Sequence, residues 1–249
     1  QEDSIQHLQD VINSENTNSL INQILSEIWF FFLVMFYYFF IGMFYSLPIY
    51  DKGHKRKIIL VTGFWGRNLY WKSMYKRMIG LGYSVYPINL GFQVGDIRKK
   101  SLILEEFMVK HDINDCFILG HSMGGWIVLG LSNKAKERIA KFFPICTSFR
   151  GSYICYTVPM FVCSWQLKPG TKFIDTQQEN LKYLSQVKNI FGKEDEIAIP
   201  VETCHTGNTE EVEFSEFGHL NLVMSKRGID FIIKQIEIVE KEIDNKVKS

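Results

Sequence analysis

The chain has 249 residues, enough for one large domain, and its 28 basic and 27 acidic side chains leave a formal net charge of +1. This balance excludes the basic surface that nucleic-acid binding requires. The five cysteines predict no disulfide framework, and the six histidines lack the spacing of metal ligands, so we expect neither a metal nor a cofactor.

The first predicted element is an uncharged apolar segment near the N-terminus. Residues 1–27 are polar, and we interpret them as a tail or as a helix leading into this segment. Residues 28–50, IWFFFLVMFYYFFIGMFYSLPIY, could cross a hydrocarbon core of about 30 Å. A signal peptide usually has a shorter apolar stretch, and a core helix this apolar would need protein on every side. The sequence therefore predicts a single-pass transmembrane anchor.

The charges on the two flanks of this anchor differ. Residues 1–27 contain no lysine or arginine, whereas the linker DKGHKRK at 51–57 is rich in them. Lysine and arginine near a membrane span favour the cytoplasmic side. We therefore expect the domain at 51–249 to lie in the cytoplasm and the tail to lie across the membrane.

Beyond the linker, short apolar runs alternate with longer amphipathic ones. The apolar runs predict strands at 58–62, 84–88, 116–120, 141–146, 187–191 and 211–215. The amphipathic segments predict helices near 69–80, 96–110, 124–132 and 225–245. This alternation is typical of an α/β fold, a mostly parallel sheet with helices on both faces. Residues 151–185 interrupt it with aromatic residues and prolines, and we interpret them as a lid-like insertion.

The segment ILGHSMGGW at 118–126 carries the clearest chemical motif. It reads Gly120-x-Ser122-x-Gly124, between a predicted buried strand and a predicted helix. A tight strand-to-helix turn strains its central residue and exposes the side chain, and the flanking residues must be small where strand and helix approach each other. We therefore predict that Ser122 is a catalytic nucleophile.

A serine hydroxyl needs a general base and a group that orients the base. After a turn of this kind, the acid and then the histidine follow later in the chain. Asp195 follows the predicted strand VKNIF, with Glu196 as the alternative acid. His219 follows the predicted strand EVEFS, and His205 is the competing base nearby. We predict that Asp195 and His219 complete a catalytic triad.

The oxyanion of an acyl-transfer reaction is usually stabilised by two backbone N–H groups. We expect one from Met123, directly after the nucleophile, and one from Phe64 in the loop LVTGFWGR. Nearby aromatic residues are consistent with an apolar substrate site and equally with core packing: Trp65, Tyr153, Phe161 and Trp165.

Several segments together resemble the α/β-hydrolase superfamily, and within it a bacterial-type lipase and esterase group similar to triacylglycerol lipases. They are ILVTGFWGRNLYW, ILGHSMGGWIVLG, FPICTSFRGS, LKPGTKFI, IFGKEDEIAIP and FGHLNLV, in the family's order. The resemblance implies a compact member with about six strands. The family usually has His-Gly where this chain has Thr62-Gly63, but backbone donation does not need that histidine, so we expect the oxyanion hole to be kept.

The residues and the resemblance together predict a membrane-anchored serine hydrolase of carboxylic esters. Lipid acyl esters are the expected substrates, and no obligatory protein partner is inferred. Thioester hydrolysis and acyl transfer to an alcohol use the same triad and stay open as alternatives. A third alternative is an inactive hydrolase-like scaffold at the membrane, although a scaffold has no reason to keep the complete triad.

Overall fold

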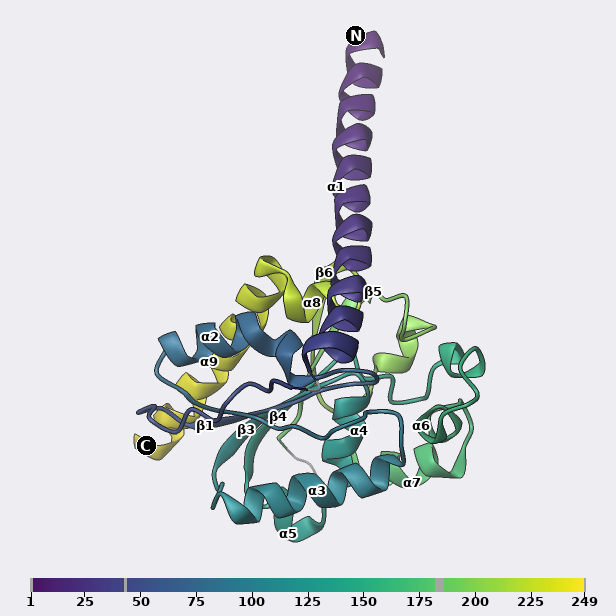
Figure 1. The fold of residues 1–249 in the computed structure, drawn as a ribbon. Coiled ribbons are helices and arrows are strands. Elements are labelled where there is room, and N and C mark those ends of the chain that lie inside the picture. Colours follow the sequence, from purple (N-terminus) through teal and green to yellow (C-terminus); the bar gives the residue numbers. More distant parts are fainter. Residues whose placement is uncertain (1, 43, 182–185, 249) are drawn as a thin grey trace.

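The computed structural model describes residues 2–42, 44–181 and 186–248 (Figure 1). Its centre is one six-stranded sheet in the order β2-β1-β3-β4-β5-β6, with all neighbouring strands parallel. The strands are β1 (Lys57–Val61), β2 (Ser84–Pro87), β3 (Cys116–His121), β4 (Ile139–Ile145), β5 (Lys188–Glu194) and β6 (Glu210–Phe217). Each of the six predicted strands is present, within a few residues of its expected bounds.

Helices cover both faces of the sheet because the strands are apolar on both sides. In β1, Ile59 and Val61 pack into one core cluster, and Ile58 and Leu60 pack into another on the opposite face. The first cluster is covered by α3 (Ile97–Lys110), α4 (Met123–Leu129), α5 (Asn133–Lys136), α6 (Val162–Gln166) and α7 (Lys172–Leu181). The second is covered by α2 (Lys72–Gly80), α8 (Asn221–Met224) and α9 (Lys226–Lys248). The predicted fold class is confirmed.

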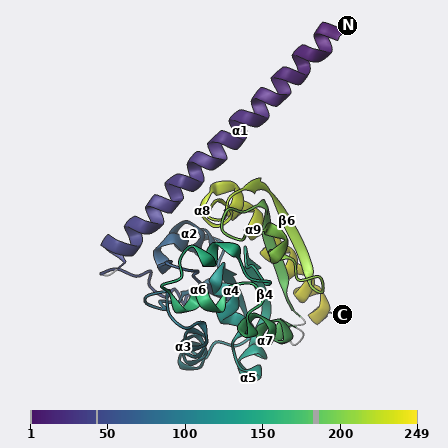
Figure 2. The same cartoon turned by 90° about the vertical axis from the view of Figure 1, so that its right-hand side faces the viewer.

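The predicted insertion at 151–185 forms short helices beside α4, and these pack on the first core cluster (Figure 2). It contains a 3₁₀ turn, Tyr153–Tyr156, followed by α6 and α7. Residues 182–185 of this insertion lie outside the described residues.

The N-terminal segment is one long helix, α1 (Glu2–Phe36), followed by a π-helical turn, Tyr37–Ile41. Its first half projects away from the domain, and its second half runs alongside α8 and β6 (Figures 1 and 2). In the described part of the chain, Ser19–Ile41 is the stretch that is long and apolar enough to cross a membrane. The apolar half of α1 is therefore also the half that contacts the folded domain.

Candidate active site

Ser122 occupies the turn between β3 and α4 in a strained backbone conformation, with φ 56° and ψ −124°. Such a conformation costs about 1–3 kcal/mol and persists only where neighbours hold it. The Ser122 N–H donates to the Ile145 carbonyl at 2.7 Å, and the Ser122 carbonyl accepts from Thr147 Oγ1 at 3.0 Å. The end of β4 therefore fixes the backbone from which the serine hydroxyl projects.

Two glycines permit this turn by allowing backbone segments to approach each other. A Cβ at Gly124 would lie 2.6 Å from the Val61 carbonyl oxygen, and a Cβ at Gly120 would lie 3.0 Å from Gly125 Cα. Both distances are shorter than ordinary van der Waals contact. A side chain at 120 would push α4 away from β3, and a side chain at 124 would push α4 away from β1. The position of Ser122 thus depends on glycine at both places.

His219 follows β6 and is tied to Asp195, which follows β5. Its Nδ1 lies 2.7 Å from Asp195 Oδ2 and 3.0 Å from Asp195 Oδ1, and both side chains are almost fully buried. Burial disfavours the imidazolium, but the Asp195 charge and hydrogen bond, together with the charges of Glu196 and Glu27, outweigh burial and raise the pKa of His219 to about 9. The sequence-predicted acid and base therefore lie in direct contact.

Asp195 is held in place by the start of its own loop. Its Oδ1 accepts from the N–H groups of Ile197 at 2.8 Å and Ala198 at 2.7 Å. Burial alone would raise the pKa of this carboxyl, but the His219 charge and these hydrogen bonds keep it below its ordinary value. Asp195 is therefore ionised and can orient Nδ1–H of His219, which leaves Nε2 as the basic nitrogen.

The loop after β1 approaches the nucleophile closely. A Cβ at Gly63 would lie 2.7 Å from Ser122 Cβ. Among the described residues, neither the Phe64 N–H nor the Met123 N–H donates to a protein acceptor. Both residues line the same cavity as Ser122, so their amides are available to an oxyanion formed there.

Buried polar side chains fix this loop. The Tyr70 hydroxyl accepts from the Gly63 N–H at 3.1 Å and lies 3.0 Å from His121 Nδ1. Gln93 Nε2 donates to the Thr62 carbonyl and to Thr62 Oγ1, each at 2.9 Å. Thr62 is therefore part of the loop's support.

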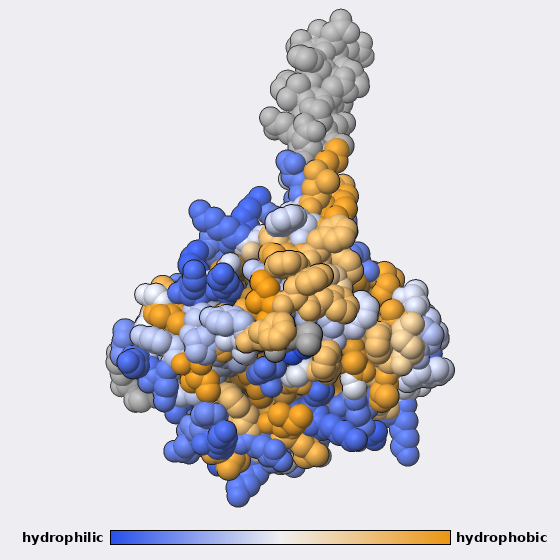
Figure 3. Space-filling view, in the orientation of Figure 1, coloured by the Kyte–Doolittle hydropathy of each residue, from blue (hydrophilic) through white to orange (hydrophobic). Residues whose placement is uncertain are grey.

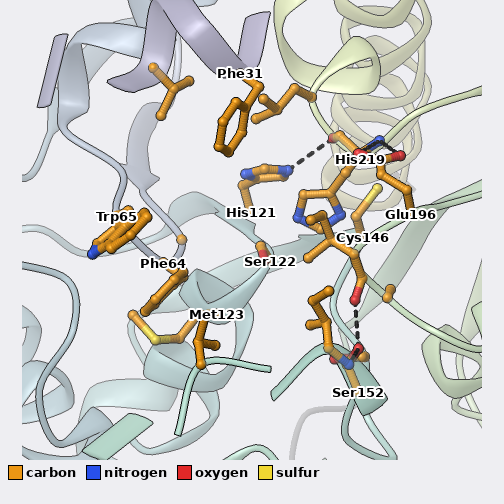
Figure 4. Close-up of a pocket in the computed structure, with 18 of the residues that line it drawn as sticks. Phe31, Phe64, Trp65, His121, Ser122, Met123, Cys146, Ser152, Glu196 and His219 are labelled. Atoms are coloured by element: carbon orange, nitrogen blue, oxygen red, sulfur yellow. Dashed lines mark hydrogen bonds between the residues drawn. The ribbon is translucent and has the colours of Figure 1, made fainter. Parts of the chain in front are cut away.

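Ser122, His219, Phe64 and Met123 line one cavity of about 570 Å³. Figure 4 shows Ser122 at its centre, with Phe64 and Met123 on one side and His219 on the other. Most of the lining is apolar, and α1 supplies one wall through Ile28, Phe31, Phe32 and Met35. Ser152 and Leu167 line it from the predicted insertion. An apolar group of substrate size fits such a cavity.

The predicted substrate-binding aromatics occupy different places. Trp65 lines the cavity, and the Phe161 ring packs edge-on against Trp65 at 5.6 Å between centroids. Phe161 itself lies outside the cavity lining, as do Tyr153 and Trp165, which are exposed. The competing base His205 bonds Glu211 at 2.8 Å and is also outside the cavity lining.

Several residues of the site were not predicted from the sequence. Phe31 comes from the predicted anchor and Glu27 from the predicted tail, while Tyr70 and Gln93 support the loop after β1. For Glu27 a signal exists: Gln23, Ser26 and Glu27 are polar residues at helical spacing, next to the apolar run that begins at Ile28. The buried Tyr70 and Gln93 have no comparable sequence signal.

His121, Cys146 and His219 form a cluster of metal-type donors within 4.8 Å of one another. Both nitrogens of His121 are engaged, with the Tyr70 hydroxyl and the His219 carbonyl, and His219 Nδ1 is engaged with Asp195. Burial raises the pKa of the Cys146 thiol, which disfavours the thiolate that binds metals. Of this cluster, His219 Nε2 and Cys146 Sγ remain as donors, fewer than the four ligands of a structural zinc site.

The chain has the α/β-hydrolase fold. No protein-family model matches its sequence, and no curated protein is similar to it in sequence. Its structure is similar to a carboxylesterase of Nitrososphaera gargenis, with TM-score 0.59 and 13 % identity over 78 % of this chain and 94 % of that one. It is also similar to a monoacylglycerol lipase of Paleococcus ferrophilus, with TM-score 0.59 and 12 % identity over 78 % and 97 %. A mature lipase of Bacillus licheniformis matches with TM-score 0.60 and 10 % identity over 78 % and 95 %.

Proposed function

We propose that this protein hydrolyses carboxylic esters through a Ser122–His219–Asp195 triad. One arrangement carries the proposal: a serine on a strained turn shares a cavity with two unpaired amides and with an imidazole bonded to a buried carboxylate. The esterases and lipases among the proteins of similar structure support this class of reaction.

The chemistry follows from the positions of these groups. His219 Nε2 takes the proton of Ser122 as its oxygen attacks the ester carbonyl, and Asp195 stabilises the imidazolium that forms. The Phe64 and Met123 amides then donate to the oxyanion, where one donor is worth about 3–4 kcal/mol. His219 next protonates the departing alcohol oxygen. Water, deprotonated by His219, finally releases the acyl group from Ser122.

We propose lipid acyl esters as the substrate class. The cavity is apolar beyond the reacting groups, and its α1 wall consists of large hydrophobic side chains. Such a surface favours a hydrocarbon chain over a polar acyl group, because water leaves apolar surface on both partners. The monoacylglycerol lipase among the similar structures is consistent with this class.

We also propose that α1 attaches the enzyme to a membrane and lies along its surface. Glu27 and Val34 face the domain and are buried, while Trp29, Phe36 and Phe40 are exposed. In Figure 3 apolar side chains gather where this half of α1 meets the domain. A helix with one face packed on a folded domain and an exposed aromatic face suits the bilayer interface.

Membrane attachment is tested by flotation with phosphatidylcholine vesicles, comparing wild type with Trp29→Ser/Phe40→Ser and with the control Lys52→Ser. We expect the double variant alone to lose binding.

Extraction of cell membranes with alkaline carbonate should release the wild type; retention would favour the transmembrane span predicted from the sequence. Protease added to intact cells then tests the predicted cytoplasmic side, because digestion of the domain would place it outside.

The proposed reaction is tested with a panel of p-nitrophenyl esters of increasing chain length, acyl-coenzyme A thioesters and phospholipids. Wild type should release the acid from esters and react covalently with a fluorophosphonate probe, and Ser122→Ala should do neither. Faster turnover of thioesters, or transfer of the acyl group to added alcohol in preference to water, would redirect the assignment. Folded wild type that neither turns over nor reacts would indicate an inactive scaffold.

A further inference from the structure

The carboxylate of Glu27 is buried within the half of α1 that packs against the domain, and it is 5 % exposed. Its two oxygens accept from successive backbone N–H groups, Oε1 from Leu220 at 2.6 Å and Oε2 from Asn221 at 2.7 Å. These are the first amides after His219, where the chain enters α8. Unpaired amides at the start of a helix bind a carboxylate favourably. Glu27 therefore fixes the backbone directly beside the proposed base.

A second carboxyl completes the contact from the other side. Glu196 accepts the His219 N–H at 3.2 Å, and it lines the same cavity as Glu27 and His219. Burial raises the pKa of Glu27 to about 8, the nearby Glu196 carboxyl raises it further, and the Leu220 and Asn221 amides oppose both effects.

The neighbouring residues of α1 contact the same turn. Gln23 Oε1 accepts the Phe217 N–H at 2.9 Å, and Ser26 Oγ donates to Asn221 Oδ1 at 2.6 Å. Gly218 adopts φ +116°, and a Cβ there would collide with Glu27 Oε2. Glycine at 218 therefore permits both the turn that precedes His219 and the close approach of Glu27 to it.

We infer that Glu27, from a helix outside the six-stranded fold, is a positioning residue for His219. Asp195 fixes the ring of the base through Nδ1, whereas Glu27 fixes the main chain directly after the base through the Leu220 and Asn221 N–H groups. Catalysis needs both, because the imidazole must align with Asp195 and with Ser122 together. The inference rests on the proposed function, in which His219 is the base.

The test compares Glu27→Ala and Glu27→Gln with the matched control Asn22→Ala, an exposed polar residue of the same helix. With p-nitrophenyl butyrate we expect Glu27→Ala to lower kcat about 10- to 100-fold at nearly unchanged KM, because a small displacement of a catalytic group costs rate. Glutamine keeps the size and one acceptor, so Glu27→Gln should lose less. Asn22→Ala should match wild type.

The pH profile separates positioning from general support of the fold. The titratable groups that face His219 are Asp195 and Glu196 after β5, His121 at the end of β3, Cys146 after β4, and Glu27 on α1. Glu27→Gln removes a carboxylate whose charge raises the pKa of His219. The acid limb of kcat/KM should therefore move to lower pH in Glu27→Gln and stay in place in Asn22→Ala.

Rates are expressed per active site, titrated with the fluorophosphonate probe, so that unfolded protein does not count. If Glu27→Gln keeps the wild-type kcat and acid limb while wild type is active, the inference is overturned and the proposed reaction stands. If Glu27→Ala only lowers Tm and the titrated sites turn over normally, Glu27 is structural and the inference is likewise overturned. A wild type that is inactive and unlabelled overturns the proposed function, and this inference with it.

Discussion

The turn that carries Ser122 and the turn that carries His219 are built differently. Ser122 follows a central strand, and its backbone is held by Ile145 and Thr147 at the adjoining end of β4. His219 follows β6 at the edge of the sheet, and Glu27 holds its turn from a position 193 residues away from Leu220. The proposed nucleophile is thus held by the sheet itself, whereas the turn of the proposed base is held in part by a helix outside the sheet.

The largest effect is expected at the nucleophile. Ser122→Ala should lower kcat/KM by about 10⁶-fold, because the variant has no oxygen to form the acyl intermediate. The fold should persist, since the backbone contacts of Ser122 remain. Turnover of p-nitrophenyl butyrate and circular dichroism measure the two expectations. A variant that keeps more than about a thousandth of wild-type turnover would contradict the assignment.

The next effect concerns which carboxylate orients the base. Asp195→Asn should lower kcat by about 10⁴-fold, because the amide cannot stabilise the imidazolium or keep the proton on Nδ1. Glu196 meets His219 at its main-chain N–H and not at its ring, so Glu196→Gln should cost about 10-fold. Steady-state kinetics on both variants check the difference. Equal losses would contradict the distinction between holding the ring and holding the main chain.

A smaller effect is expected beside the nucleophile. Tyr70→Phe removes the hydroxyl that accepts the Gly63 N–H and contacts His121. A buried amide left without a partner costs about 1–3 kcal/mol. We therefore expect kcat/KM to fall about 10-fold, because the loop that carries Gly63 and Phe64 is held less firmly. Tyr75→Phe, on the neighbouring helix and outside the cavity lining, is the control. An unchanged rate in Tyr70→Phe would show that the sheet alone holds this loop.

The last expectation concerns pH rather than a substitution. His219 accepts a proton only when neutral, and its pKa is raised to about 9, chiefly because Asp195 outweighs the opposing effect of burial. The kcat/KM of wild type should therefore increase with pH, with a midpoint near 9. Rates from pH 6 to 10.5, corrected for spontaneous ester hydrolysis, measure it. A midpoint at the ordinary histidine value of about 6.5 would show that the Asp195–Glu196–Glu27 surroundings do not act on the base.

The difference between the Ser122 turn and the His219 turn also explains what could be predicted from the sequence. The strands were predictable because buried parallel strands are continuous apolar runs, and the turn at Ser122 was predictable because close approach demands glycine at fixed offsets. The contacts of Glu27 with Leu220 and Asn221 join residues nearly two hundred positions apart, and the wall formed by Phe31 is also distant in sequence from Ser122. No local pattern encodes such pairings. Apolarity predicted a membrane segment but could not distinguish the face that meets the domain.

The rotational register of α1 is a consequence of these contacts. Glu27, Phe31 and Val34 follow one another at spacings of four and three residues, so they form a single stripe along the helix. Inserting one residue after Glu27 would rotate everything beyond it by about 100°, turning the cavity wall outward while leaving composition and apolar length almost unchanged. A simple hydrophobic tether would tolerate such an insertion, and this helix should not.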